Sequence, residues 1–374
     1  KTTALYDRFI NQGAVMGDSF GLENVLWFAN NKEDAYEEPT IKRSRSHNYV
    51  SKEVINVREN VGIIEVANFS KHEFKGPDAR KFLDFIMAGR LPKPGRISLS
   101  PMLSYRGKLC GDLTVACLDE NEFIVFGSGA AQEMHRRWFE SHLGKFNVNY
   151  NNRSDEFHGL SIAGPNSRKV LEKIVREDIS NEKFKFRDSR RMFVGGVPAI
   201  VNRISFTGEL GYEIYVAPHY QIKLYEELIQ AGKEFTIKPF GGRALMSMRL
   251  EKNWGAWTLD YRPDFTAKET GLDTFINWNK DFIGKENAQK DNSTKKIVPL
   301  IVETNEIDVT NNEAVVNGNE SIGYVTSGGF AHYVNKSVAF TFLDQNKINY
   351  DNKIQIEING DLFNCSLIKD SLYD

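Results

Sequence analysis

Residues 203–216 carry the side chains of this 374-residue chain whose types and spacing best suit ligand binding. Two runs rich in β-branched and aromatic residues flank a glycine-containing turn at 207–211, so the stretch predicts a β-hairpin. Strand alternation then places Glu213 and Tyr215 on one face and their apolar neighbours on the other. A carboxylate beside an aromatic ring can bind a flat heterocycle that has adjacent N–H donors. The alternative is a solvent-facing Glu on an ordinary hairpin.

A second carboxylate, Asp112, stands inside an apolar strand pattern, L-C-G-D-L-T-V at residues 109–115. Burying an unpaired carboxylate is costly, so Asp112 either faces water on an edge strand, is paired, or is functional. Arg243 and Arg249 lie six residues apart on one predicted helix and project to different faces. Either can clamp a carboxylate, although a surface Arg is usually solvated.

Composition excludes several classes of function. The formal net charge of −2 offers no general attraction to nucleic acid or to an anionic membrane. No apolar run approaches the roughly 20 residues of a membrane span. The seven His lack metal-ligand spacing, so no metal is expected, and nucleotide-binding and hydrolase motifs do not occur. Three Cys without a C-x-x-C pair predict neither a disulfide framework nor zinc, and favour a reducing compartment, cytoplasm or mitochondrial matrix.

The elements that must position these side chains divide the chain into an arm and three units. Residues 1–50 read as an N-terminal arm, 51–150 as a first α+β unit and 151–285 as a second. The motif Gly-Pro-polar occurs between a strand and a helix at 76–78 and again at 164–166, which indicates a duplicated strand–helix–strand unit. Residues 286–374 combine short strands with Asn/Gly turns, which predicts a small β-barrel-like domain.

Several motifs together resemble one known family. They are F-T-G-E-L-G-Y-E-I at 206–214, S-M-R-L-E-K at 247–252 and D-F-I-G-K at 281–285. In this order they resemble the glycine-cleavage T-protein (aminomethyltransferase) family. The similarity is closest to the folate-binding C-terminal half of dimethylglycine and sarcosine dehydrogenases, and it spans nearly the whole chain.

The resemblance implies a fold and a cofactor. The implied fold is α+β, with two related ferredoxin-like units plus a C-terminal β-barrel, in a three-leaf arrangement around a central folate pocket. The implied cofactor is tetrahydrofolate. By motif, Glu213 binds the pterin edge, Tyr215 lines it, and Asp112 is the acid near the one-carbon transfer centre.

Three further residues are candidate folate contacts by the same resemblance. Arg243 is expected near the benzoyl-glutamate side, and Glu209 and Tyr105 join the folate-binding set. The sequence also departs from the family pattern. Gly111 precedes Asp112 where relatives often carry a second acid, and Phe206 stands where they often have Tyr.

Three functions stay open at this point. The first is an enzyme that transfers a methyl or methylene unit to tetrahydrofolate from a small molecule with an N-methyl or S-methyl group. The second is the folate-binding half of a larger demethylating enzyme, with a flavin-containing domain or subunit as partner. The third is a non-catalytic folate-binding module. Retention of Asp112 beside the folate favours chemistry.

Overall fold

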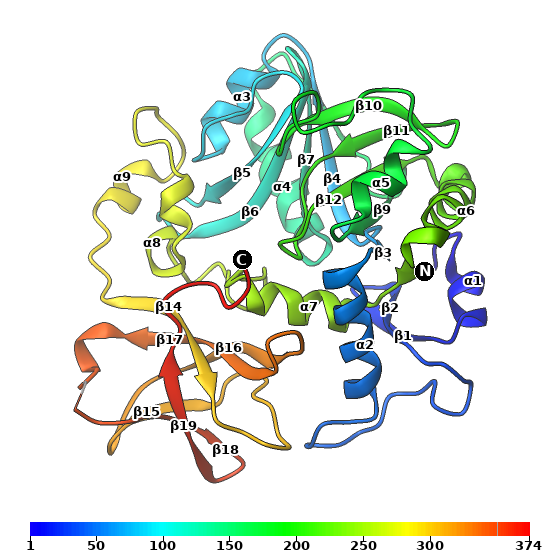
Figure 1. Ribbon diagram of the computed structural model, residues 1–374. Coiled ribbons are helices and arrows are strands. Elements are labelled where there is room, and N and C mark those ends of the chain that lie inside the picture. The colour runs from blue at the N-terminus through cyan, green and yellow to red at the C-terminus, as the bar shows by residue number, and fades with distance from the viewer. Residues whose placement is uncertain (350) are drawn as a thin grey trace.

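The computed structural model describes residues 1–349 and 351–374. Figure 1 shows two units of mixed helix and strand above a smaller β-domain, with α7 (Gly242–Glu251) crossing the middle of the molecule. The chain's C-terminal end lies close to this centre in the same view. The expected α+β class, with a separate β-barrel at the C-terminal side, is confirmed.

The first unit is built on a five-stranded antiparallel sheet in the order β5-β6-β7-β4-β8. Its strands are β4 (Phe69–Lys75), β5 (Arg96–Leu103), β6 (Leu109–Asp119), β7 (Glu122–Ser128) and β8 (Asn149–Asn152). Its helices are α3 (Ala79–Ile86) and α4 (Gln132–Leu143). The apolar residues of α3 recur at helical spacing and are buried, which fixes the face that packs on the sheet.

The second unit has a six-stranded sheet in the order β10-β11-β12-β9-β3-β13. Its strands are β3 (Gly62–Glu65), β9 (His158–Ala163), β10 (Ser189–Val194), β11 (Val197–Asn202), β12 (Gly211–Val216) and β13 (Lys238–Pro239). Its helices are α5 (Ser167–Glu172) and α6 (Gln221–Gly232). All pairs are antiparallel except that of β13 with β3.

The two units repeat one topology. Each runs strand, helix, three-strand meander, helix, strand, and the order β5-β6-β7-β4-β8 maps onto β10-β11-β12-β9-β13 with β3 inserted. The Gly-Pro turns repeat as well: Gly76 and Gly164 both have positive φ, at 139° and 130°. In each turn the glycine carbonyl accepts a 3.0 Å hydrogen bond from the residue three positions on. The predicted duplication is therefore confirmed.

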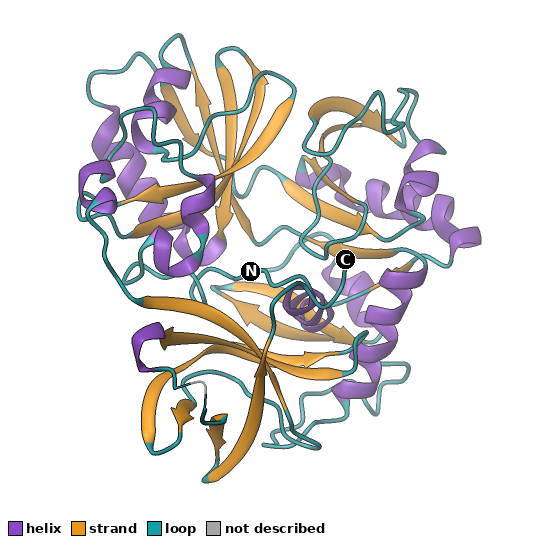
Figure 2. Cartoon of the chain, turned by 60° about the vertical axis from the view of Figure 1, so that its left-hand side comes forward, coloured by secondary structure: helices purple, strands orange, loops and turns teal. Residues whose placement is uncertain are grey.

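The two sheets pack face to face, and helices cover their outer sides (Figure 2). One buried cluster joins the inner faces of both sheets, with members that include Ile97, Ile124, Phe126, Ile64 and Tyr215. Separate clusters lie under α3 and α4 on the first sheet and under α5 and α6 on the second. The space between the sheets is therefore the interior that both units share.

The predicted arm is folded onto these units. Residues 1–50 contain α1 (Tyr6–Asn11), the hairpin of β1 (Ala14–Ser19) with β2 (Leu22–Phe28), and the start of α2 (Ser46–Glu59). Leu5 and Trp27 are completely buried, one in the cluster under α6 and the other in the cluster between the sheets. Since β3 pairs in the second sheet, the two predicted units interlock instead of following one another.

The C-terminal domain is a closed barrel in the order β14-β17-β16-β15-β18-β19. Its strands are β14 (Lys295–Val302), β15 (Ala314–Asn317), β16 (Glu320–Ala331), β17 (Lys336–Asp344), β18 (Ile354–Ile358) and β19 (Asp361–Leu367). The short helices are α8 (Ala267–Thr270) and α9 (Lys285–Gln289), with 3-10 turns at Gly129–Ala131, Pro218–Tyr220, Lys233–Phe235, Leu272–Phe275 and Gln345–Lys347.

One strand prediction needs correction. The hairpin that carries Glu213 pairs β12 with β11, and residues 203–210 form its loop instead of contributing a strand. Ser and Thr side chains bond one another and the backbone within that loop, which competes with a strand ladder. The neighbouring strands β10 and β11 form a tight hairpin, because Gly195 and Gly196 take the positive φ values of a two-residue turn.

A buried ion pair fastens the barrel to α7. The Arg249 guanidinium donates to Asp260 Oδ2 at 2.7 Å and to Ser327 Oγ at 2.8 Å. Asp260 also accepts from Thr326 at 2.5 Å and from the Ala256 backbone N–H at 3.0 Å. Both charged side chains are at most 1% exposed. This network therefore joins α7, the 254–261 loop and β16 through direct contacts that are shielded from solvent.

We expect Asp260→Ala to lower the free energy of unfolding by about 3–5 kcal/mol, because it leaves the Arg249 charge buried and uncompensated. Asp264→Ala is the matched control: Asp264 lies three residues after the 254–261 loop, its side chain is 63% exposed, and it pairs with Arg262 at 3.1 Å. That change should cost about 1 kcal/mol or less. Urea unfolding of both variants measures the difference, and equal losses would contradict the assignment.

Candidate functional site

Strand β12 points two functional side chains toward the first sheet. Tyr212, Ile214 and Val216 join the apolar cluster under α5 and α6, whereas Tyr215 joins the cluster between the sheets. Glu213 shares the face of Tyr215 by alternation and is 8% exposed. The predicted alternation is confirmed, and the interpretation of Glu213 as a solvated surface residue is wrong.

The Tyr215 ring is held in one orientation by its neighbours. It lies over Gly159 of β9, where a Cβ atom would come within 2.6 Å of the Tyr215 Cε1 atom. On the first sheet, the Phe126 ring lies with its centroid 4.7 Å from that of Tyr215. The Tyr215 hydroxyl donates to Glu213 Oε2 at 2.9 Å. Packing therefore fixes the ring, and the ring's hydroxyl fixes the carboxylate.

The register of the first sheet places Asp112 on the same interior face. Thr114 on β6 and Lys71 on β4 both lie directly opposite Phe126 of β7, so these three side chains form a row on one face. Asp112 precedes Thr114 by two residues and shares that face, and it is partly buried. The sheet thus directs Asp112 into the shared interior that Glu213 and Tyr215 face from the other side.

Both carboxyl groups have pKa values close to neutral pH. Burial raises the pKa of Asp112 to about 7 and that of Glu213 to about 7. For Glu213, the Tyr215 hydrogen bond and then the charge of Lys71 act in the opposite direction. Within the described residues, no cation lies within 4 Å of either carboxylate, and Tyr215 is the only side chain that donates to either. Unpaired buried carboxylates are typical of functional sites.

The 252–285 loop closes one side of Asp112. Its Phe265 carbonyl accepts a 2.9 Å hydrogen bond from the Leu109 N–H at the start of β6. Tyr261 of this loop is 5% exposed, and its hydroxyl accepts from the Gly255 N–H at 3.2 Å. Burial and then the Asp112 charge raise the pKa of Tyr261. An aromatic hydroxyl therefore lies close enough to Asp112 to interact with its charge.

Two other candidates are engaged in contacts of their own. Arg243 begins α7, forms an ion pair with Glu37 and donates to Ser46 Oγ at 2.9 Å, with its side chain 41% exposed. Glu209 accepts from the buried Arg58 guanidinium at 2.9 Å. Folate contacts by Arg243 and Glu209 stay predictions.

Tyr105 lies apart from the shared interior. It is 61% exposed in the β5–β6 turn, its hydroxyl is 2.9 Å from His142 Nε2, and its ring packs near Trp138. Both partners belong to α4, which covers the opposite face of the first sheet from Asp112. The structure does not bring Tyr105 together with Asp112 and Glu213, and a folate contact for it stays a prediction.

Sequence reasoning missed Lys71 and Phe126. In β4 the charged residues Lys71, Glu73 and Lys75 occupy alternate positions, which is typical of a strand with one solvated face. Lys71 is nevertheless completely buried. Only the packing of a second sheet on that face, which no local pattern signals, turns it inward.

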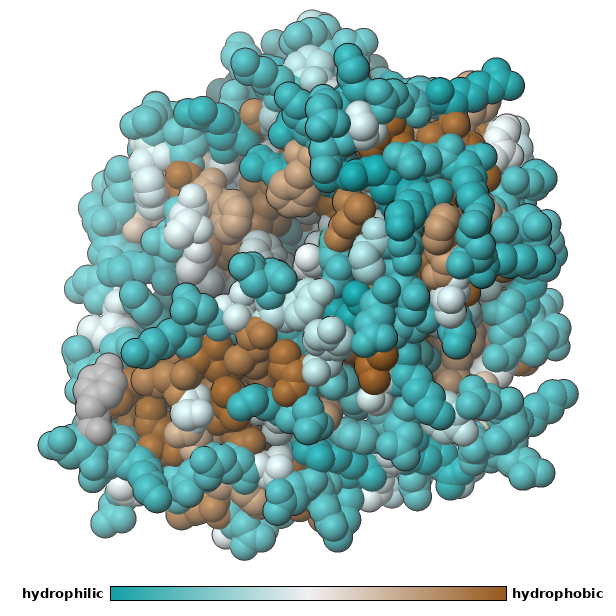
Figure 3. All heavy atoms as spheres, viewed as in Figure 1, coloured by the Kyte–Doolittle hydropathy of each residue, from teal (hydrophilic) through white to brown (hydrophobic). Residues whose placement is uncertain are grey.

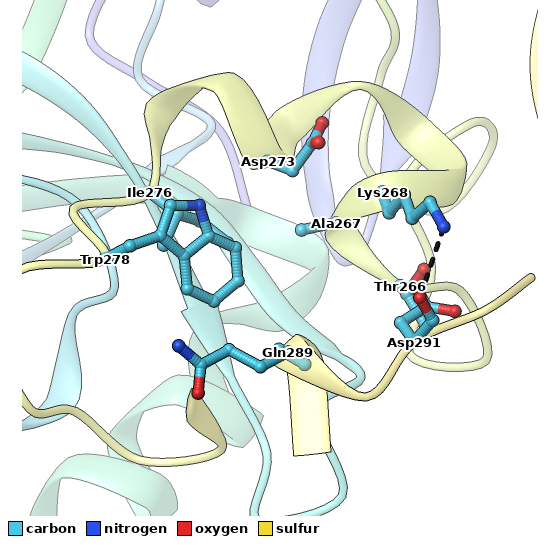
Figure 4. A pocket seen from close by; sticks show the side chains of 9 residues that line it. Thr266, Ala267, Lys268, Asp273, Ile276, Trp278, Gln289 and Asp291 are labelled. Carbon is cyan, nitrogen blue, oxygen red and sulfur yellow. Dashed lines mark hydrogen bonds between the residues drawn. The ribbon is translucent and has the colours of Figure 1, made fainter. Parts of the chain in front are cut away.

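The surface is hollowed near the centre of the face shown in Figure 3, between the two upper units and the barrel. A separate pocket of about 320 Å³, drawn in Figure 4, lies at α8 and α9 among Thr266, Lys268, Trp278 and Gln289. The residues that line this pocket do not include Asp112, Glu213 or Tyr215. Among the described residues, no cluster of three or more His, Cys, Asp or Glu could hold a metal ion.

Comparison with known proteins gives matches along nearly the whole chain. Residues 5–280 match the GCVT N-terminal domain, and residues 295–374 match the glycine cleavage T-protein C-terminal barrel domain. Mitochondrial dimethylglycine dehydrogenase of Mus musculus is 33% identical over 96% of this chain and 42% of the relative. Aminomethyltransferase of Thermoanaerobacter pseudethanolicus is 30% identical over 85% of this chain and 87% of the relative. The chain thus spans less than half the length of the dehydrogenase.

The fold has a close counterpart among solved structures. The crystal structure of glycine cleavage system aminomethyltransferase T from Bartonella henselae superposes with a TM-score of 0.84, covering 98% of this chain and 96% of that one, at 22% identity. Two family matches in order and a shared fold agree with the motifs at 206–214 and 247–252. The chain belongs to the glycine-cleavage T-protein family, whose aminomethyltransferases are tetrahydrofolate-dependent enzymes.

Proposed function

We propose that this protein binds tetrahydrofolate in the interior shared by the two sheets and transfers a one-carbon unit to it. The observation that carries the proposal is the pair of desolvated carboxylates, Asp112 and Glu213, which face one interior and have no cation within 4 Å among the described residues. A ligand that brings N–H donors and a developing positive charge suits both groups. The donor is a small molecule with an N-methyl or S-methyl group. The unit is a methyl when it passes without a redox change, or a methylene when a flavin-containing domain or subunit first removes two electrons from an N-methyl donor.

The side chains present fit the pterin group. Glu213 Oε2 accepts from Tyr215, which leaves Oε1 free to accept from an N–H edge. Tyr215 and Phe126 supply aromatic surface. Tetrahydrofolate supplies the nucleophilic nitrogen that accepts the one-carbon unit.

Different side chains of the protein bind the ligand and stabilise the charge that develops on it. Glu213 binds and orients the ligand through hydrogen bonds, and the Tyr215 hydroxyl holds that carboxylate in place. Asp112 stabilises positive charge on an atom bound against its carboxylate, and with a pKa raised to about 7 it can also hold a proton there. The 252–285 segment brings the buried Tyr261 close enough to Asp112 for its hydroxyl to interact with that charge.

A second candidate is the folate-binding part of a larger demethylating enzyme with a flavin-containing domain or subunit. It is favoured by the span of the chain, which covers 42% of the Mus musculus dimethylglycine dehydrogenase and 44% of the human one. Among the described residues no helix is long and apolar enough to cross a bilayer. The cytoplasm and the mitochondrial matrix are both candidate compartments.

One experiment separates these functions. Anaerobic tetrahydrofolate should raise the melting temperature of the purified chain, as any ligand selective for the native state does. Product analysis with dimethylglycine, sarcosine and a methylsulfonium compound then identifies the donor. Turnover of the sulfonium compound without an oxidant supports a self-sufficient transferase. Folate binding without turnover of any donor supports the binding half or a non-catalytic module.

Glu213→Ala should chiefly weaken folate binding, because it removes a charge-assisted contact made in both the ground and the transition state. Such a contact is worth roughly 1.5–3 kcal/mol, or about ten- to a hundredfold in affinity. Calorimetric titration with tetrahydrofolate measures the loss. Glu213→Gln, which keeps one acceptor oxygen, should lose less. Unchanged affinity of both variants would remove Glu213 from the site.

Asp112→Asn keeps the side chain's shape and removes its charge. We expect turnover to fall by about two orders of magnitude or more, with tetrahydrofolate affinity nearly intact. Asp119→Asn, at the exposed end of the same strand, should leave both quantities unchanged. A fully active Asp112→Asn, or one that loses folate binding as strongly as Glu213→Ala, would falsify the role of Asp112.

A further inference from the structure

Lys71 is a charged side chain in the shared interior that the proposed mechanism leaves without a role. It lies on β4, directly opposite Phe126 of β7, and is completely buried. Its Nζ atom is 5.8 Å from the centroid of the Tyr215 ring, whose hydroxyl bonds Glu213. Lys71 and Glu213 are therefore both neighbours of the same tyrosine, Lys71 near its ring and Glu213 at its hydroxyl.

The ammonium group of Lys71 has N–H donors that bond no acceptor among the described residues. An ammonium carries three N–H donors, and Nζ donates to one acceptor within the described residues, the Ala67 carbonyl at 2.9 Å. No carboxylate of the described residues lies within 4 Å of it. Burying a cation in this way is costly, and burial lowers the pKa of Lys71 to about 7. The fold thus retains a cation that forms no ion pair of its own.

Charged and titratable groups face Lys71 from several elements. They are Glu65 on β3, Glu213 and Tyr215 on β12, Asp155 after β8, and Lys1 at the N-terminal end. Glu65 is bonded to Gln221 of α6, and Asp155 is paired with Lys1. Glu213 is the carboxylate of this set that shares the inner face of β12 with Tyr215, and among the described residues Lys71 is the cation that lowers its pKa. Lys71 acts in the same direction on Glu65, whose partner Gln221 is neutral.

We propose that Lys71 is a positioning residue for Glu213: its buried charge, acting past the Tyr215 ring, keeps Glu213 in the anionic form that accepts hydrogen bonds from the N–H edge of a bound heterocycle. This inference rests on the proposed folate function. It assigns to Lys71 an indirect role, since Lys71 acts through Glu213 and need not touch the ligand.

The direction of the pH dependence follows from the two charges. Glu213 titrates near pH 7, so ligand binding strengthens as the pH rises through neutrality. Lys71 loses its charge only as the pH rises through its own pKa of about 7, so it acts on Glu213 in the range where Glu213 titrates. Because Lys71 lowers the pKa of Glu213, removing Lys71 raises it and moves the onset of binding to higher pH.

The test measures tetrahydrofolate affinity of the full chain by anaerobic calorimetry between pH 6 and pH 9. Lys71→Met keeps the aliphatic stem and removes the charge. An upward shift of about one unit in the Glu213 pKa should weaken binding about fivefold at pH 7 and less than about twofold at pH 9. Lys71→Arg, which keeps a cation, should restore binding at pH 7. If Lys71→Met does not fold, Lys71→Gln takes its place with the same expectation.

Two controls separate this inference from simpler explanations. Lys75→Met alters the same face of β4 at a half-exposed site and should leave the pH profile unchanged. A loss of affinity by Lys71→Met that is equal at every pH indicates a packing defect and overturns the inference. Glu213→Gln tests the proposed function itself, because it should weaken binding and abolish the pH dependence. If it does so while Lys71→Met matches the wild type, the inference fails and the proposed function stands.

Discussion

The contact between the Tyr215 and Phe126 rings, with centroids 4.7 Å apart, is the point on which the rest of the site depends. Each ring belongs to the inner face of a different sheet, so the contact sets how closely the two units approach. Gly159 has no Cβ atom, and therefore the Tyr215 ring can lie flat on its own sheet, where its hydroxyl reaches Glu213. Aromatic pairs hold such geometry better than aliphatic contacts do.

Duplication explains why the acids of the site come from different units. If β7 is aligned with β12 so that Phe126 matches Tyr215, then Ile124 occupies the place of Glu213. In the same alignment, β6 matches β11 and Pro198 occupies the place of Asp112. Each unit therefore carries one acid where its counterpart carries an apolar residue. A symmetric interior would hold four carboxylates, and their mutual repulsion and desolvation would be far harder to stabilise.

Much of the fold followed from local patterns. The alternation at 211–216 assigned the two faces of β12, and the Gly-Pro turns revealed the repeat, because both signals arise from neighbouring residues. The pairing of β3 with β9, nearly a hundred residues away, left no local signal. For the same reason the burial of Lys71 left no local signal: which face of β4 is covered depends on a sheet formed later in the chain. The 203–210 loop was misjudged because side-chain hydrogen bonds overrode strand propensity.

A physical criterion distinguishes among the candidate residues that the sequence put forward. Arg243 and Glu209 already have partners of opposite charge, so a ligand that engaged them would first have to compete with an existing ion pair. Tyr105 is exposed, and its position costs the fold little. Asp112 and Glu213 are desolvated without such partners, a state that the folded protein maintains at the expense of stability. Natural proteins tolerate such strain mainly where a ligand relieves it, and this makes the unpaired buried acids the stronger candidates.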